Sequence, residues 1–237
     1  MAAIAIYSLK GGVGKTSMAV NLGWCAAMLA ARRTLLWDLD PQAASTWLLG
    51  GAAPGDQAQA VFAQDIAVDR LIRPTAIPRL SLLGADDSLR GLDLLFHRID
   101  KKKRLSKLIE RLAGFDRVIL DCPPGLTETT EQMLRAVDLI VVPVVPSALA
   151  TRALEVVDGH VRGRVPIMPV HVMADRRRRL HAEALAAHPD WPVIPMASLV
   201  EAMGERRAPI GGFAPRSAAA QAYARLWQAI ERRLARS

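Results

Sequence analysis

A glycine-rich segment between an apolar run and a helical pattern is the strongest constraint on the fold. Residues 2–9 (AAIAIYSL) predict a buried strand, and residues 16–32 (TSMAVNLGWCAAMLAAR) predict the helix after it. Between them stands SLKGGVGKTS, Ser8 to Ser17. A strand, a glycine loop and a helix in this order predict a phosphate-binding turn, because loop amides and the positive helix end converge on an anion.

The loop departs from the general phosphate-loop pattern G-x-x-x-x-G-K-[ST] at its first position, where Leu9 replaces glycine. The rest of the pattern is intact. Lys15 is predicted to reach the β- and γ-phosphates of a nucleotide, and the Thr16 hydroxyl to ligate Mg²⁺. The expected cofactor-binding residues of the loop are Lys10, Gly11, Gly12, Val13, Gly14, Lys15, Thr16 and Ser17.

Further apolar runs alternate with helical segments along the chain. Strands are predicted at 33–40, 79–85, 116–124, 137–147, 165–175 and 191–197, and a basic helix at 91–113. This order predicts an α/β fold: a mostly parallel twisted sheet, helices on both faces, and ligands at the carboxyl ends of the strands. No linker or low-complexity tract interrupts the 237 residues, so 1–237 is expected to form a single domain.

Carboxylates end two of these strands. Asp121 closes RVILD and is expected to hold Mg²⁺ through water. Asp38 and Asp40 end WDLD, and both side chains point to one side if the strand continues through them. A role as a cap or turn residue remains open for Asp38 and Asp40, since Asp-Pro favours turns.

Composition narrows the classes of partner and location. The chain has 31 Lys and Arg against 23 Asp and Glu, a net charge of +8, which favours an anionic partner such as nucleic acid or a membrane surface. Cys25 and Cys122 lie in apolar runs and are expected to be buried thiols in a reducing cytoplasm. Neither an export leader nor a membrane-spanning run is visible, so a cytoplasmic protein is expected.

KGGVGKT, DLDPQ and LDCPP together resemble the deviant Walker A ATPases of the ParA/MinD group, and the ParA branch most closely. HVMADRRRRLHAE and GERRAPIGGFAPRSAAAQAYARLWQAI are also similar in layout, so the resemblance covers nearly the whole chain. It implies a P-loop NTPase of the deviant Walker A type that hydrolyses ATP with Mg²⁺.

The resemblance implies roles for particular residues. Lys10 matches the signature lysine, which in the family reaches the partner's phosphates across an ATP-sandwich homodimer. Lys10, Lys15 and Asp40 are therefore the expected catalytic residues. Asp40 matches the acid that positions the hydrolytic water, and Thr16, Asp40 and Asp121 are the expected Mg²⁺ ligands. Asp121 with Pro123 and Gly125 matches the second switch, and Asp175 is a candidate nucleotide contact beside segments 173–175 and 195–196.

The resemblance also implies partners. In ParA proteins the C-terminal region forms a basic surface that holds DNA without sequence preference, and phosphate contacts by arginine give such binding. The candidate DNA contacts are Arg206, Arg207, Arg216, Arg225, Arg232 and Arg233, with a solvated helix face as the alternative. The resemblance implies a protein that associates with the nucleoid. It implies further that this protein positions a plasmid, a chromosome origin, or an assembly such as a carboxysome or chemoreceptor cluster. A ParB-like or cargo-adaptor protein stimulates its ATP hydrolysis. Because the chain begins with its first strand, no N-terminal helix-turn-helix domain is expected.

Two other readings remain open. MinD-like proteins, which act in cell-division placement, end in a membrane-binding amphipathic helix. The last helix here has an apolar stripe of Tyr223, Leu226, Trp227, Ile230 and Leu234. Core packing is favoured for that stripe, so a membrane partner is not expected. The third interpretation is a metabolic member of the superfamily, either an amidoligase or an iron-sulfur carrier. The chain lacks the cysteine pair that an iron-sulfur carrier needs.

Overall fold

One mixed sheet of eight strands organises the computed structural model, which describes residues 1–51, 55, 57–63, 66–99 and 103–236. The strand order is β3-β4-β2-β5-β1-β6-β7-β8. The strands are β1 Ala2–Ile6, β2 Thr34–Asp38, β3 Ile72–Pro74, β4 Leu80–Leu83, β5 Arg117–Asp121, β6 Leu139–Val144, β7 Ile167–Ala174 and β8 Val193–Pro195. All pairs are parallel except β3 with β4 at one edge, which confirms the predicted α/β class.

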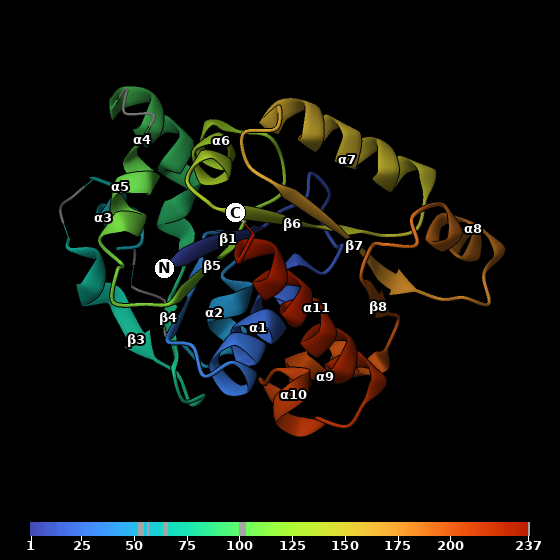
Figure 1. Ribbon diagram of the computed structural model, residues 1–237. Coiled ribbons are helices and arrows are strands. Elements are labelled where there is room, and N and C mark those ends of the chain that lie inside the picture. The colour runs from blue at the N-terminus through green and yellow to red at the C-terminus, as the bar shows by residue number, and fades with distance from the viewer. Residues whose placement is uncertain (52–54, 56, 64–65, 100–102, 237) are drawn as a thin grey trace.

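Helices cover both faces of this sheet (Figure 1). One layer contains α3 Ala60–Ala63, α4 Leu92–Ile99, α5 Arg104–Glu110, α6 Glu128–Arg135 and α7 Ala148–Val161. The opposite layer contains α1 Lys15–Trp24, α2 Ala44–Leu48, α9 Ser198–Arg206, α10 Ile210–Phe213 and α11 Ala218–Leu234. Helix α8, Arg179–Ala187, joins β7 to β8 at the far edge.

The central strand β1 shows how the sequence builds two cores. Ala3 and Ala5 face the core under α4 to α7, whereas Ile4 and Ile6 face the core under α1 and α11. Successive side chains of a strand point to opposite faces, so an apolar run without alternation can be buried on both sides. The buried strand predicted at residues 2–9 is therefore confirmed, although β1 itself ends at Ile6.

The carboxyl ends of three central strands meet at one level. Asp121 of β5 pairs in register with Ile6 of β1 on one side and with Asp38 of β2 on the other. The glycine loop leaves β1 directly after this level. The sheet therefore places the loop and both strand-end carboxylates side by side, as the fold class predicts for a ligand site.

Several predicted boundaries were wrong. The helix predicted at 16–32 begins at Lys15, ends at Trp24 and continues as a π-helical turn, Cys25–Leu29. The strand predicted at 33–40 ends at Asp38. The edge strand β3 was not predicted, because three residues of which two are exposed carry little apolar pattern. Cys25 and Cys122 are buried free thiols, as expected.

The basic helix predicted at 91–113 is divided. A 3₁₀ turn, Asp87–Gly91, precedes α4, and α5 begins at Arg104, while residues 100–102 lie outside the described residues. Phe96 of α4 and Leu105 and Leu108 of α5 pack into the same core. At 100° per residue a single straight helix would carry Phe96 and Leu105 on opposite sides, so the chain must break between them.

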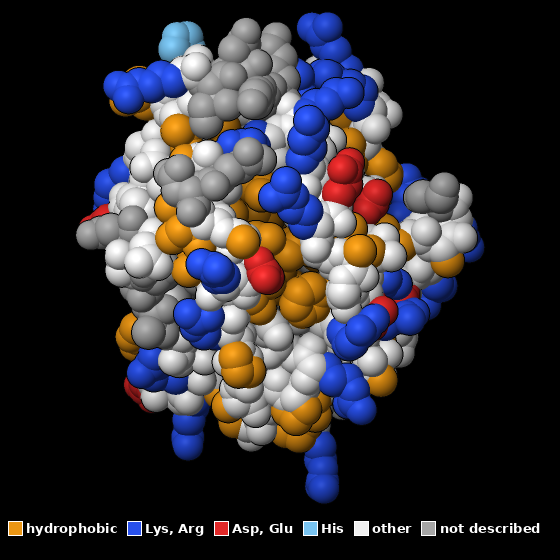
Figure 2. Space-filling view, turned by 90° about the vertical axis from the view of Figure 1, so that its left-hand side faces the viewer, with side chains coloured by type: hydrophobic (Ala, Val, Ile, Leu, Met, Phe, Trp, Pro, Cys, Tyr) orange, Lys and Arg blue, Asp and Glu red, His pale blue; other side chains and the backbone are white. Residues whose placement is uncertain are grey.

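Basic side chains are spread over the face formed by β3, α3, α4 and α5 (Figure 2). Exposed members include Arg73, Arg98 and Lys107. Positive charge is therefore not confined to the C-terminal segment that the sequence singled out.

Helix α11 packs as core. Tyr223, Leu226, Trp227 and Ile230 are each at most 3% exposed, and Leu234 is partly buried. Glu231, near the end of the helix, accepts hydrogen bonds from Arg117 at 2.8 and 2.9 Å and from Arg32 at 3.1 Å. The apolar stripe therefore belongs to the interior, which confirms core packing over an exposed lipid-binding face.

Close packing of α10 on α1 gives a direct test of this layer. A methyl group at Gly211 would lie 2.3 Å from the Trp24 ring, whereas one at Gly212 meets nothing closer than 3.8 Å. We expect Gly211→Ala to lower the free energy of unfolding by about 1–3 kcal/mol through overpacking. The matched variant Gly212→Ala should be neutral or slightly stabilising. Urea titration of both variants checks this, and equal stabilities would contradict the packing.

Candidate nucleotide site

The glycine loop has an open, left-handed backbone at two positions. Gly12 has φ +72° and Gly14 φ +84°, values that residues with a side chain rarely adopt. No atom lies within 4 Å of a Cβ built on Gly11 or Gly12. The loop therefore leaves room above its backbone for a bulky anion, and the start of α1 at Lys15 supplies the helix N-terminus.

Lys15 lies inside the loop. Its ammonium donates a hydrogen bond to the Lys10 carbonyl at 2.9 Å, and the residue is 7% exposed. Burial lowers the pKa of Lys15, while the charges of Asp121 and Asp40 oppose that change. Among the described residues, the hydrogen-bond partner of this buried cation is one neutral carbonyl. Lys15 is therefore well placed to exchange that carbonyl for phosphate oxygens, which are stronger acceptors.

Asp121 is the buried carboxylate of the site. Its Oδ2 accepts a hydrogen bond from the Ser45 hydroxyl at 2.7 Å, and its Oδ1 is buried without a hydrogen-bond partner among the described residues. Burial raises the pKa of Asp121, and the hydroxyls of Ser45 and Thr16 counteract this. An orphaned carboxylate oxygen beside a threonine hydroxyl and a lysine fits hydrated Mg²⁺, which prefers oxygen ligands and retains waters.

The two aspartates of WDLD have different environments, which corrects the expectation of a shared strand face. Asp38 is fully buried, and its Oδ2 accepts from the Thr46 amide and hydroxyl, both at 2.8 Å. Its Oδ1 accepts from the Asp40 amide at 3.2 Å, so the chain turns there. Asp40 is half-buried, and its Oδ1 accepts from the Gln42 amide at 2.9 Å. Asp38 thus organises the turn, and Asp40 remains accessible for chemistry.

Three positioning residues were missed by the sequence reasoning. Ser45 and Thr46 hold Asp121 and Asp38, and the Tyr7 hydroxyl donates to the Gly125 carbonyl at 2.7 Å, which ties the turn after β5 to the end of β1. The hydroxyl pair in DPQAAST was a visible signal, because a buried strand-end acid needs nearby donors. Tyr7 looked like one more residue of an apolar strand.

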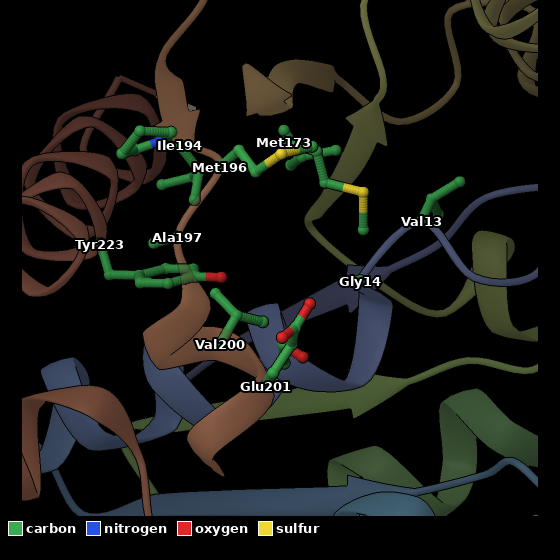
Figure 3. Close-up of a pocket in the computed structure, with 12 residues that line it drawn as sticks. Val13, Gly14, Met173, Ile194, Met196, Ala197, Val200, Glu201 and Tyr223 are labelled. Atoms are coloured by element: carbon green, nitrogen blue, oxygen red, sulfur yellow. The ribbon is translucent and has the colours of Figure 1, made fainter. Parts of the chain in front are cut away.

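A cavity of about 150 Å³ opens beside the loop (Figure 3). Val13 and Gly14 lie on one side, Met173 and Met196 on another, and Glu201 and Tyr223 point their polar ends into the space. This apolar slot adjoining a phosphate loop suits a nucleobase. The full lining is Val13, Gly14, Ser17, Val172, Met173, Ile194, Pro195, Met196, Ala197, Val200, Glu201 and Tyr223.

Asp175 does not line this cavity. Its carboxylate forms an ion pair with Arg177 at 2.9 Å, and that pairing lowers the pKa of Asp175 to about 2. Met173, two residues earlier, has φ +51° at a register shift between β7 and β8, which turns its side chain toward Gly14. Segments 173–175 and 195–196 thus reach the site through their methionines, and a nucleotide contact by Asp175 stays a prediction.

Lys10 and the predicted DNA-contacting arginines lie outside the loop's interior. The side chain of Lys10 is half-buried, whereas Arg206, Arg207, Arg216, Arg225, Arg232 and Arg233 are all exposed. Arg206 and Arg207 lie at the end of α9, Arg216 before α11, and Arg225, Arg232 and Arg233 on α11. Contacts of Lys10 with a second subunit and of the arginines with DNA therefore remain predictions, although their exposure permits them.

Comparisons with known proteins agree with this geometry. The family described as AAA domain matches residues 1–161. The chromosome-partitioning ATPase Soj of Thermus thermophilus is 34% identical over 249 residues, which cover 98% of this chain and 96% of the relative. The chain belongs to the ParA/MinD family of ATPases.

Within this family the matches to other curated relatives are shorter. The sporulation initiation inhibitor protein Soj of Bacillus subtilis is 39% identical over 148 residues, covering 60% of this chain and 57% of the relative. The match to the chromosome partitioning protein ParA of Myxococcus xanthus spans 50% of that protein. The chain thus spans about half the length of these two relatives.

Several solved structures share the fold over nearly the full chain. The ATP complex of a McdA variant from Cyanothece has a TM-score of 0.81 at 20% identity, covering 97% of this chain and 95% of the other. A cobyrinic acid a,c-diamide synthase from Mycobacterium smegmatis, with an ATP analogue and magnesium, has a TM-score of 0.80 at 26% identity, covering 98% and 94%. The first of these structures is an ATP complex, and the second holds an ATP analogue and magnesium.

Lys15→Ala tests the phosphate loop. Removing the buried ammonium should weaken ATP binding by about 3 kcal/mol, roughly 100-fold in Kd, because charged hydrogen bonds to phosphate are lost. Lys10→Ala, five residues earlier in the same loop, is the matched control and should bind ATP nearly as tightly as the unmodified chain. Titration with a fluorescent ATP analogue measures both, and normal affinity in Lys15→Ala would refute the assignment.

Proposed function

We propose that this protein is a ParA-type ATPase whose ATP-bound homodimer holds DNA without sequence preference and positions a cargo. The observation that carries the proposal is the arrangement at the ends of β1, β2 and β5. An open phosphate loop, a buried acid with an orphaned oxygen and an accessible second acid lie together there. Full-length similarity to a chromosome-partitioning ATPase supports the ParA branch.

The residues of the site divide the work of ATP hydrolysis. Lys15 and the loop amides bind the phosphates, Thr16 and Asp121 hold the hydrated metal, and Asp40 orients the attacking water from its half-buried position. Bound Mg²⁺ neutralises developing phosphate charge. Ser45 and Tyr7 fix the positions of Asp121 and of the turn at Gly125.

Lys10 completes the site of a second subunit in this proposal. Its backbone carbonyl is bonded to Lys15, whereas its half-buried side chain has no hydrogen-bond or ion-pair partner among the described residues. An ammonium delivered from a partner subunit offsets charge on the phosphates in the way an arginine finger does. ATP binding therefore favours dimerisation, and ATP hydrolysis lets the two subunits separate.

The exposed C-terminal arginines supply the surface for DNA. Arginine contacts to phosphates give salt-dependent affinity without base readout, which suits a protein that moves over the nucleoid. A ParB-like or cargo-adaptor protein stimulates hydrolysis, and the cargo is a replicon or a protein assembly. The arginines of α9 and α11 are exposed, so a DNA backbone can reach their guanidinium groups from solvent.

A MinD-like function at a membrane surface is the alternative, because that family branch shares the fold. The buried stripe of α11 argues against a lipid-binding face on this helix. Among the described helices, none is both long enough and apolar enough to cross a membrane. Co-sedimentation with ATP separates the two functions: lipid vesicles should leave the protein in solution, and DNA should retain it.

Asp40→Ala tests the hydrolytic step. Loss of the water-orienting carboxylate should lower kcat by about 100-fold or more while ATP binding persists. The variant should still form a dimer with ATP, because Asp40 is not needed to hold the phosphates. Asp69→Ala, at an exposed acid on the 3₁₀ turn Val68–Leu71, is the control. Light scattering and phosphate release check both properties, and a monomeric Asp40→Ala with ATP would count against this role.

Arg216→Glu tests the DNA surface. Reversing this charge should weaken binding to a mixed-sequence duplex and reduce the slope of log affinity against log salt by roughly one or more. Arg73→Glu, at an exposed arginine of β3, serves as the matched charge reversal. Fluorescence anisotropy across a salt series gives the slopes. A stronger effect at Arg73 would transfer the DNA surface to β3 and its neighbours.

A further inference from the structure

Arg207 and Arg206 are adjacent, but their side chains differ in environment. The Arg207 guanidinium donates to the Trp47 carbonyl from Nε at 3.1 Å and from Nη2 at 2.8 Å. Its Cζ also lies 5.2 Å from the centroid of the Trp47 ring. No hydrogen bond or ion pair joins the Arg206 side chain to another described residue. Arg207 therefore forms a clamp on α2, and Arg206 does not.

The backbone of Arg207 is held in a conformation suited to glycine. Arg207 ends α9 with φ +45°. Its own amide donates to the Gly204 carbonyl, and the Ala208 amide donates to the Met203 carbonyl, both at 3.4 Å. A residue with a side chain in this region is held there by its surroundings. The backbone conformation at the end of α9 thus orients the Arg207 side chain, so that its guanidinium contacts Trp47.

The other side of α2 holds the acids of the nucleotide site. Ser45 donates to Asp121, and Thr46 donates to Asp38, immediately before Trp47 in the sequence. Helix α2 has only five residues and cannot persist without such tertiary contacts. Trp47 and Ser45 lie within a single turn of α2. Loss of the Arg207 contact with Trp47 is therefore expected to shift the Ser45 hydroxyl.

The clamp is anchored to the phosphate-loop helix. Asn21 of α1 donates to the Met203 sulfur at 3.1 Å and accepts from the Ile210 amide at 2.9 Å. The end of α9 is thereby fixed relative to α1. Because the end of α9 stays in place, we expect α2 to be the segment that moves when the contact between Arg207 and Trp47 is lost.

We propose that Arg207 is a positioning residue that couples the nucleic-acid surface to the nucleotide site through α2. This rests on the proposed function. A DNA phosphate is a stronger acceptor than a carbonyl, so it draws the exposed guanidinium away from Trp47. Helix α2 loosens, Ser45 releases Asp121 Oδ2, and that oxygen becomes available to the hydrated metal. By linkage, metal and nucleotide binding raise the affinity of Arg207 for DNA.

Hydrogen exchange of the amides at 45–50 tests the clamp without nucleotide or DNA. Arg207→Ala should accelerate exchange there by about tenfold, because it removes both guanidinium hydrogen bonds to the Trp47 carbonyl and the ring contact. Arg207→Lys should accelerate it too, because an ammonium lacks the planar fork. Arg90→Ala, at an exposed arginine paired with Asp87, should leave it unchanged. Equal exchange in Arg207→Ala and Arg90→Ala would overturn the proposal.

Addition of a mixed-sequence DNA duplex tests the coupling. DNA should accelerate exchange at 45–50 in the unmodified chain and lower the Mg²⁺ concentration for half-maximal ATP turnover. Arg207→Ala should show the lowered Mg²⁺ requirement without DNA, whereas a merely destabilised protein would lose turnover at every Mg²⁺ concentration. Bound DNA that leaves exchange unchanged would refute the coupling. Failure of DNA to bind would remove the DNA surface of the proposed function and the coupling with it, while exchange in Arg207→Ala would still decide the clamp.

Discussion

A carboxylate buried at the end of a central strand sets the requirements that the rest of this site meets. Asp121 lies between β1 and β2, away from water, where an ionised group is stable only with donors or a cation beside it. Ser45 supplies one donor, Lys15 supplies positive charge, and one oxygen remains for a metal. Lys15 draws the phosphate loop to Asp121, and Ser45 draws α2, so the loop and α2 share one anchor.

The parts of the fold that could be predicted were those specified by local chemistry. Gly12 and Gly14 need left-handed backbone, and an apolar run such as 2–9 needs burial on both faces, so the loop and its strand followed from the sequence. The strand order did not, because register among parallel strands depends on crossovers far apart in the chain. The break between α4 and α5 was visible in the phase of their apolar residues, but only once both were assigned to one core.

The roles of Asp38 and Asp40 could not be separated from spacing alone. Their difference arises because Thr46 captures Asp38 and ends the strand, which frees the next acid from the sheet. Arg206 and Arg207 illustrate the same limit: composition treats them alike, yet the left-handed turn at the end of α9 directs one of them onto Trp47. Side-chain roles that depend on a neighbour distant in sequence require the three-dimensional structure.

The ion pairs of Glu231 have a mechanical consequence for the basic surface. Arg117, which grips Glu231, is the first residue of β5, and Asp121 is the last. A strand is stiff along its length, so α11 cannot hinge independently of the sheet that carries the metal-site acid. The backbone positions of Arg225 and Arg232 are thus separated by a fixed distance of about 10 Å along the axis of α11, which helical geometry sets. Any polyanion held by α11 must adapt its own shape to that spacing.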